Sequence, residues 1–226
     1  MSKYNFKEFD TVNPDGSWGK CLSHVQKDST VLEFGCASGY MTRYMKEKLG
    51  CHVDIVEIDK EDFDKASKYA CNGWQGDIET MGWYKTFRGN RYDHIMFADV
   101  LEHLKDPMAV LKDAADLLEE GGTIIASIPN ICHNDILIKM FYDCFTYTDL
   151  GLLDSTHVHF WGIRDFLVQC EAVGLHVKEC NCVAVRTGQT EQRLPLDQVS
   201  GELIKLLLDR EFGEAYQYVF VIEKKG

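Results

Sequence analysis

The pentapeptide Gly-Cys-Ala-Ser-Gly at residues 35–39 is the strongest candidate for a ligand-binding turn in this chain of 226 residues. It follows the apolar run TVLEF at 30–34 and leads into a helical stretch. Two glycines allow a sharp turn and let a ligand approach the main chain, where the first turn of a helix offers N–H groups. Taken alone, the pattern also fits a tight strand-to-helix connection that binds nothing.

Position 40 bears on the class of cofactor that this turn suits. A dinucleotide-binding fingerprint needs a third glycine there, because helix and strand pack tightly at that point. The residue is Tyr40, and no Tyr-x-x-x-Lys pair follows the fourth expected strand. A nicotinamide-dependent oxidoreductase is therefore the less favoured alternative.

Acidic residues follow the next two expected strands, at positions where a nucleoside would bind. Glu57 lies near the end of the strand expected at 52–59, 18 residues after Gly39, and can accept hydrogen bonds from both hydroxyls of a ribose. Asp77, in GDIE, is placed to bond an adenine amino group, and Ile78 offers the ring an apolar face. Each could instead be a solvated loop residue, but their succession at strand ends favours a ligand.

The elements that position these residues alternate between short β-rich runs and helical stretches, which is typical of parallel βαβ units. We expect strands at residues 30–34, 52–59, 92–100, 121–130, 175–185 and 215–225, and a short strand with its exit loop at 74–79. We expect helices at residues 18–26, 39–50, 59–70, 107–119, 163–172 and 196–212. This order predicts an α/β fold with a doubly wound, seven-stranded, mostly parallel sheet that binds its ligand at the carboxyl ends of the strands.

Bulk composition narrows the classes of partner. The net charge of −12 argues against the broad basic surfaces that bind nucleic acid or anionic membranes. No apolar run approaches the length of a membrane span, and MSKYNFKEFD lacks the apolar core of a signal peptide, so we expect a cytoplasmic protein. The nine cysteines include no CxxC pair and are expected to be reduced thiols, not metal ligands.

Five segments, taken in order, resemble the motifs of class I S-adenosylmethionine-dependent methyltransferases. They are VLEFGCASGYMT, IVEID, GDIE, YDHIMFADVLEHLKDP and GGTIIASIPN, and they cover about residues 30–130. The resemblance implies a methyltransferase with S-adenosylmethionine as its cofactor, and a sheet in the order 3-2-1-4-5-7-6 with the last strand antiparallel. The cofactor contacts expected from motifs and resemblance together are Glu33, Gly35, Cys36, Ala37, Gly39, Glu57, Ile58, Asp77, Ile78 and Asp99. Ala37 stands where the family more usually has the middle glycine of its cofactor loop.

The resemblance extends into residues 131–162, the segment expected to bind the acceptor. IPNICHND and LLDSTHVHFWG are similar to a bacterial subgroup often associated with glycan or cell-envelope biosynthesis. This implies a small polar acceptor, such as a sugar or glycan precursor, methylated on oxygen. The subgroup carries a phrase close to LLDRTHLRFFT, from which Ser155, His159, Trp161 and Gly162 depart. N-methylation of a small molecule and a cofactor-binding protein without catalysis are the alternatives.

Three histidines are candidates for the general base that a hydroxyl acceptor would need near neutral pH: His103, His133 and His157. A lone histidine more often caps or packs, but His157 lies in a loop dense with aromatic residues and is the first choice. Asp99, Glu102 and His103 could also share one face of a helical turn and hold a cation. Two carboxylates are few for a hard cation, so we expect no metal.

One domain is expected over residues 1–226, with an N-terminal arm and helix at 1–29. Four prolines and the absence of a Gly/Ser-rich tract leave little room for a linker. The leucine-rich stripe at 203–208 favours core packing, with a contact between two copies as the alternative.

Overall fold

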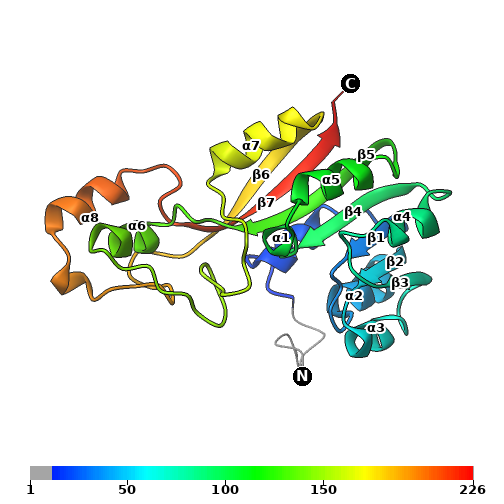
Figure 1. The fold of residues 1–226 in the computed structure, drawn as a ribbon, viewed down its shortest axis with the longest axis horizontal. Helices are drawn as coiled ribbons and strands as arrows, with labels where there is room; N and C mark the ends of the chain where they lie inside the picture. The colour runs from blue at the N-terminus through cyan, green and yellow to red at the C-terminus, as the bar shows by residue number, and fades with distance from the viewer. Residues whose placement is uncertain (1–11, 226) are drawn as a thin grey trace.

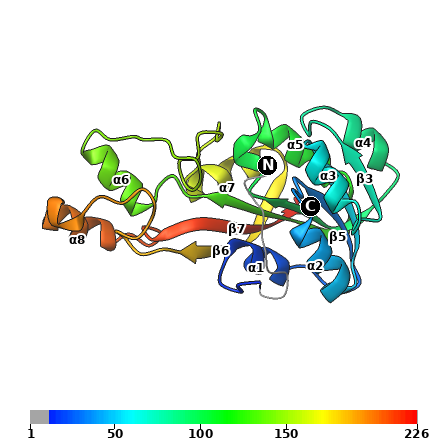
Figure 2. The same ribbon diagram turned by 90° about the horizontal axis from the view of Figure 1, so that it is seen from below.

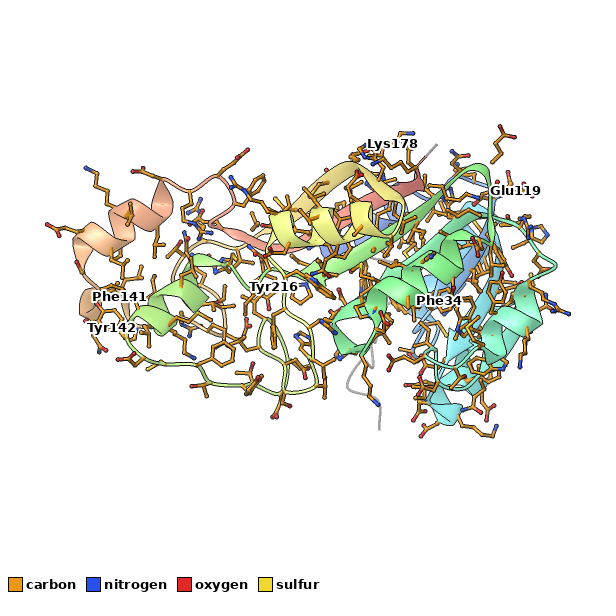
Figure 3. The ribbon with its side chains drawn as sticks, turned by 45° about the horizontal axis from the view of Figure 1, so that its top comes forward. Phe34, Glu119, Phe141, Tyr142, Lys178 and Tyr216 are labelled. Atoms are coloured by element: carbon orange, nitrogen blue, oxygen red, sulfur yellow. The ribbon has the colours of Figure 1, made fainter. Side chains whose placement is uncertain are left out.

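The computed structural model describes residues 12–225 and shows two regions of unequal size. The larger is a sheet with helices on both faces, and the smaller is a lobe around α6 (Asn134–Phe141) and α8 (Gly201–Leu208) at one end of the sheet (Figure 1). Figure 3 shows the same division, with Phe34 inside the sheet region and Phe141 and Tyr142 at the outer end of α6. Most of the arm expected before residue 17 lies outside the described residues.

The sheet has seven strands in the order β3-β2-β1-β4-β5-β7-β6. They are β1 (Thr30–Phe34), β2 (His52–Glu57), β3 (Asn72–Gln75), β4 (Tyr92–Ala98), β5 (Leu118–Pro129), β6 (Leu175–Ala184) and β7 (Ala215–Lys224). The first five strands pair in parallel, and β7 is antiparallel to both of its neighbours. The predicted fold class, strand order and single antiparallel strand are confirmed.

Two apolar layers hold helices against the sheet, because side chains alternate between its faces. Val31 and Ile55 join one cluster with α1 (Ser17–Ser23), α2 (Tyr40–Leu49) and α3 (Lys60–Ala66). Leu32 and Phe34 join the other, with α4 (Gly82–Phe87), α5 (Pro107–Ala115) and α7 (Ile163–Ala172). Figure 2 shows α1 and α2 on the face opposite α4, α5 and α7. Strands buried on both faces explain why the first runs read as continuous apolar stretches.

Local sequence signals place several helix starts. Asp59 is the N-cap of α3 and accepts a hydrogen bond from the backbone N–H of Asp62 at 2.9 Å. Pro107 occupies the first turn of α5, and Asp106 caps that helix through the N–H of Ala109. Each cap satisfies an N–H group that the helix itself leaves unbonded.

Several expected boundaries differ from the structure. The third strand runs from Asn72 to Gln75, and Asp77 lies in its exit loop as expected. The helix expected at 59–70 ends at Ala66. The helix expected at 107–119 ends at Ala115, because Leu118 pairs with Tyr92 and starts β5 before the two glycines. The helix expected at 196–212 divides into the short 3₁₀ helix η2 (Leu196–Gln198) and α8.

The smaller lobe has its own modest cores. Ile138 packs with Val199 and Leu207, and Leu203 and Ile204 of α8 lie against them. The outward side chains Leu206 and Leu208 are exposed. The nine cysteines form no disulfide within residues 12–225. In the same range, no helix has the length and apolarity needed to cross a membrane.

Candidate functional site

The turn after β1 adopts the left-handed backbone that its composition suggested. Gly35, Ala37 and Gly39 have φ angles of 65°, 45° and 81°. At Gly39 an added Cβ would lie 2.6 Å from the Cα of Ala66, so glycine here lets α2 pack closely on α3. Gly39 does not line either cavity described below, and its contact with the cofactor stays a prediction.

Glu57 ties this turn to the end of β2. Its Oε2 accepts the backbone N–H of Ala37 at 2.8 Å, and its Oε1 accepts that of Asp59 at 2.9 Å. Burial raises the pKa of Glu57, and these main-chain hydrogen bonds oppose the rise. The carboxylate therefore lies where the loop after β1 meets the loop after β2.

A cleft of about 540 Å³, called the main cleft below, opens at the carboxyl ends of the strands. Its lining includes seven of the ten predicted cofactor contacts: Gly35, Ala37, Glu57, Ile58, Asp77, Ile78 and Asp99. A side pocket of about 80 Å³ shares Gly35, Ala37 and Asp99 with it and adds Glu33 and Cys36. Trp18 of α1 and Tyr40 of α2, whose rings lie 5.2 Å apart, complete that pocket.

Two buried groups of the side pocket hold their protons tightly. Burial raises the pKa of Glu33 to about 8, while the hydroxyl of Thr42 donates a hydrogen bond to its carboxylate. Burial also raises the pKa of the Cys36 thiol, helped by the negative charges of Glu33 and Glu57. These groups are poor nucleophiles or bases at neutral pH and suit a packing or binding role.

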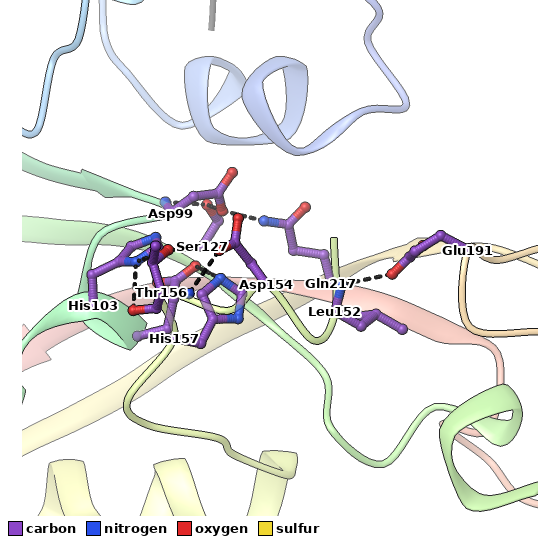
Figure 4. A network of polar contacts seen from close by, with 10 residues as sticks. Asp99, His103, Ser127, Leu152, Asp154, Thr156, His157, Glu191 and Gln217 are labelled. Atoms are coloured by element: carbon purple, nitrogen blue, oxygen red, sulfur yellow. Dashed lines mark hydrogen bonds and ion pairs between the residues drawn. The ribbon is translucent and has the colours of Figure 1, made fainter. Parts of the chain in front are cut away.

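Asp99 lies where the main cleft and the side pocket meet. Its φ of 58° is unusual for a residue other than glycine. The hydroxyl of Ser127 donates to its Oδ1 at 2.6 Å, and the amide of Gln217 donates to the same oxygen (Figure 4). Burial raises the pKa of Asp99 to about 6. Strands β5 and β7 thus hold a strained carboxyl at the centre of the site.

Of the three candidate histidines, only His103 lines the main cleft. It ends the 3₁₀ helix η1 (Leu101–His103), and its Nδ1 lies 3.3 Å from the carbonyl of Thr156 and 3.2 Å from that residue's Oγ1. The Thr156 hydroxyl donates its hydrogen to Asp154 at 2.6 Å (Figure 4). Since a carbonyl can only accept, this contact favours the tautomer that carries its hydrogen on Nδ1, in which Nε2 is the basic nitrogen.

His157, the first choice from the sequence, lies behind His103. Its side chain is largely buried, its ring centroid is 4.8 Å from that of His103, and its Nε2 is 4.0 Å from Oε1 of Glu102. Glu102 is 1% exposed, burial raises its pKa strongly, and its Oε2 has no hydrogen-bond partner among residues 12–225. The structure therefore places His157 against a buried carboxyl and outside the cleft lining.

Glu102, His103 and His157 are also the group that could hold a cation, with ligand atoms within 4.8 Å of one another. The grouping differs from the predicted one, because Asp99 bonds to Ser127 and Gln217 instead. One carboxylate and two imidazoles would suit a transition metal better than Mg²⁺ or Ca²⁺.

His133 is turned away from the cleft. It is fully buried, its Nδ1 accepts the N–H of Asp135 at 3.1 Å, and its Nε2 bonds to the carbonyl of Val185 at 2.8 Å. Both ring nitrogens are thus occupied by main-chain groups in capping α6. This geometry contradicts the expectation that His133 is a candidate base.

Sequence reasoning missed Asp154, Thr156 and Gln217. Asp154 and Thr156 stand in the quoted phrase LLDSTHVHFWG, beside the histidine that was chosen. The available signal was Thr156, a short polar residue that lies close in sequence to the acidic Asp154. Gln217 lies inside a strand, and no local pattern connects it with Asp99, 118 residues earlier.

Comparisons with known proteins agree with the fold. A family model described as a methyltransferase domain matches residues 19–179. A ubiquinone biosynthesis O-methyltransferase of Parvibaculum lavamentivorans is 30% identical over 106 residues, which cover 46% of this chain and 42% of that protein. A tRNA U34 carboxymethyltransferase of Pasteurella multocida is 28% identical over 116 residues, 49% of this chain and 36% of that protein. The chain thus spans less than half the length of either relative.

Among solved structures, a SAM-dependent methyltransferase from Archaeoglobus fulgidus has a TM-score of 0.64 at 17% sequence identity. The match covers 93% of this chain and 92% of that one. At that identity the likeness concerns the fold. It reaches beyond the strands of the site into the smaller lobe.

Proposed function

The chain belongs to the methyltransferase domain family, whose cofactor is S-adenosylmethionine, and from this premise we propose that the protein methylates a small hydroxylated acceptor. The observation that carries the proposal is the convergence of residues from the ends of β1, β2, β3 and β4 on one cleft. Its volume lies within the range of about 300–1,000 Å³ that small-ligand sites occupy. When bound, the cofactor supplies an electrophilic methyl group on a sulfonium sulfur.

The residues of the cleft fit an adenosyl ligand. Each oxygen of the Glu57 carboxylate accepts one main-chain N–H and keeps a second acceptor site, which leaves two for ribose hydroxyls. Asp77 receives the N–H of Glu79 on Oδ1, so its other oxygen can accept from an adenine amino group. Ile58 and Ile78 offer apolar faces to the base. Gly35, Ala37 and Asp99 would border the remainder of the ligand.

His103 is the general base in our proposal. It faces the cleft, and the Asp154–Thr156 pair fixes the orientation and tautomer of its ring. Its Nε2 would take the proton of the acceptor hydroxyl as the C–O bond to the methyl group forms and the bond between that methyl group and sulfur breaks, which would leave S-adenosylhomocysteine. His157, against Glu102, would support the ring of His103 from behind. Positioning of the acceptor supplies much of the remaining rate enhancement.

For the acceptor we favour a small polar molecule, such as a sugar or glycan precursor, methylated on oxygen. The net charge of −12 opposes a polyanionic substrate such as the tRNA in the name of one relative. The O-methyltransferase relative supports oxygen as the target atom, and N-methylation is the alternative. The exposed Leu206 and Leu208 of α8 support a homodimer contact, which stays a prediction.

Calorimetry and labelling together test the proposal. We expect micromolar binding of S-adenosylmethionine and none of NADH, followed by transfer of labelled methyl to at least one member of a panel of sugars, phenols and amines. Binding of NADH alone would overturn the proposal in favour of an oxidoreductase. Cofactor binding without transfer to any acceptor would instead indicate a non-catalytic cofactor-binding protein.

A further inference from the structure

A chain of rings leads from the main cleft to the molecular surface. The centroid of His103 lies 4.8 Å from that of His157, which lies 6.1 Å from Phe160. Phe145 and Tyr147 each lie 6.4 Å from Phe160 and 5.4 Å from one another. We call Phe145, Tyr147 and Phe160 the aromatic face.

The aromatic face is exposed and yet held in place. Phe145 is 42% and Tyr147 is 52% exposed, although both are large hydrophobic groups. Hydrogen bonds hold the backbone that follows Tyr147. Thr148 N–H donates to the carbonyl of Leu153 at 2.8 Å, and Leu152 N–H donates to Glu191 at 2.7 Å (Figure 4). Rings that are ordered before binding cost little entropy when a ligand covers them.

The same stretch is joined directly to the residues that border the cleft. The backbone N–H groups of Val158 and His159 both donate to the carbonyl of Glu102, at 2.8 and 3.1 Å. His159 Nε2 bonds to the carbonyl of Lys105 at 3.0 Å, and Lys105 lines the cleft. The stretch that carries the aromatic face is therefore fastened to the residues that border the cleft.

The charge of this stretch restricts what can lie on it. Residues 140–163 contain no lysine or arginine, and Asp143 and Asp149 are exposed there. An anionic group would be repelled, and an anionic membrane surface is opposed for the same reason. Stacking and apolar contact are what the rings offer to an uncharged ligand.

We propose that the aromatic face is the outer part of the acceptor subsite and binds an uncharged planar or apolar portion of the acceptor, while the reacting hydroxyl lies at His103. The inference rests on the proposed function and narrows its acceptor to hydroxylated molecules with such an extension. A bare small polar molecule would fill only the inner part of this surface.

Binding of the uncharged fluorescent probe N-phenyl-1-naphthylamine to the full chain, saturated with S-adenosylhomocysteine, tests the proposal. We expect Phe145→Ala and Tyr147→Ala each to weaken probe binding by about 2- to 10-fold, and Tyr147→Phe, which keeps the ring, to leave it unchanged. Phe141→Ala is the matched control, since Phe141 is 64% exposed but lies at the outer end of α6, outside the ring chain (Figure 3). Thermal unfolding checks that all variants fold.

Equal probe binding by the wild type and the two alanine variants would overturn the proposal, and so would an equal loss in Phe141→Ala. A dimer in sedimentation that dissociates in Phe145→Ala would overturn it too, by assigning the face to a second copy. Calorimetry with S-adenosylhomocysteine separates this outcome from failure of the proposed function. If the cofactor product does not bind, the methyltransferase proposal fails whatever the probe does.

Discussion

The two ends of the proposed site are built in different ways. We call the region of Glu57 and the turn at 35–39 the cofactor end, and the region of His103 the acceptor end. At the cofactor end, Glu57 holds the turn at 35–39 through partners that lie within 20 residues along the chain. At the acceptor end, His103 is oriented by Thr156 from 53 residues away, and Asp99, which lies between the two ends, is held by Gln217 from 118 residues away. The first end is assembled from neighbouring strand–turn units, and the second from loops and strands that only the finished sheet brings together.

This difference predicts that the two ends control different quantities, cofactor affinity and turnover. Changes at the cofactor end should alter cofactor affinity, because its carboxylates and amides border the expected adenosyl site. Changes at the acceptor end should alter turnover while the cofactor still binds. Variants that affect both quantities equally would show that the two ends act as one unit.

The largest effect is expected at the acceptor end. His103→Ala should lower kcat by about 10²- to 10⁴-fold, the range typical for loss of a general base. The affinity for S-adenosylmethionine should stay within about twofold, because nothing at the cofactor end is removed. Steady-state kinetics and calorimetry on the same preparation measure the two quantities.

A second variant separates positioning from chemistry at this end. Thr156→Val removes the hydroxyl between Asp154 and His103 and leaves the main-chain carbonyl, so the ring keeps its basic nitrogen but is held by one contact instead of two. We expect a smaller loss of kcat than in His103→Ala, with a shift in the pH profile of kcat. If His157→Ala loses all turnover while His103→Ala stays active, His157 and not His103 is the general base.

The next effect concerns the cofactor end. Glu57→Ala should weaken S-adenosylhomocysteine binding by about 100-fold, since hydrogen bonds to a charged group contribute about 1.5–3 kcal/mol each. Glu61→Ala is the matched control, because Glu61 is a fully exposed carboxylate in the first turn of α3. Unchanged affinity in Glu57→Ala would contradict the adenosyl site. Calorimetry measures both variants.

A moderate effect is expected on stability as a function of pH. The pKa of Glu33 rises from 4.5 to about 8 in the folded chain, so the native state binds a proton that the unfolded state releases above pH 4.5. The free energy of unfolding should therefore fall as the pH rises through this window, by at most about 1.4 kcal/mol per pH unit from this group.

Glu33→Gln isolates that contribution, because glutamine keeps a carbonyl oxygen for the Thr42 hydroxyl and does not ionise. Urea unfolding at pH 5 and pH 8 should show a smaller loss of stability in the variant than in the wild type. Since Asp99, Glu57 and Glu102 are present in both proteins, they cancel in the difference. Parallel curves would mean that Glu33 is already ionised near pH 5.

The smallest effect is expected from removal of metal. EDTA should leave turnover unchanged, because Nδ1 of His103 is engaged by Thr156 and Glu102 supplies a single carboxylate. Turnover is compared before and after dialysis against the chelator. If turnover is lost and Zn²⁺ or Mn²⁺ restores it, the group of Glu102, His103 and His157 binds a catalytic metal.

Much of the fold could be predicted because its signals are local. The first strand and the α7 helix have the expected bounds, and the helices expected from residues 59 and 107 begin with the cap Asp59 and with Pro107. Errors arose where strand pairing overrode the local conformational preference of the sequence. For example, Leu118 pairs with Tyr92, so β5 begins before the two glycines. The same holds for the candidate site. The local pattern indicated Glu57 and Asp77, which line the main cleft. It did not indicate the residues that orient other side chains, which are Asp154, Thr156 and Gln217.

The sequence by itself determined a parallel, doubly wound sheet and the set of residues at the ends of β1 to β4, because glycine turns, caps and apolar runs act over a few residues. The strand order followed from the family resemblance. Only the tertiary structure distinguishes the environments of the three histidines. Burial against main-chain groups removed His133 from the candidates, the carboxyl of Glu102 placed His157 behind the cleft, and a threonine from a distant loop oriented His103 toward it. Burial and long-range contact depend on how the elements pack, and no local spacing records them.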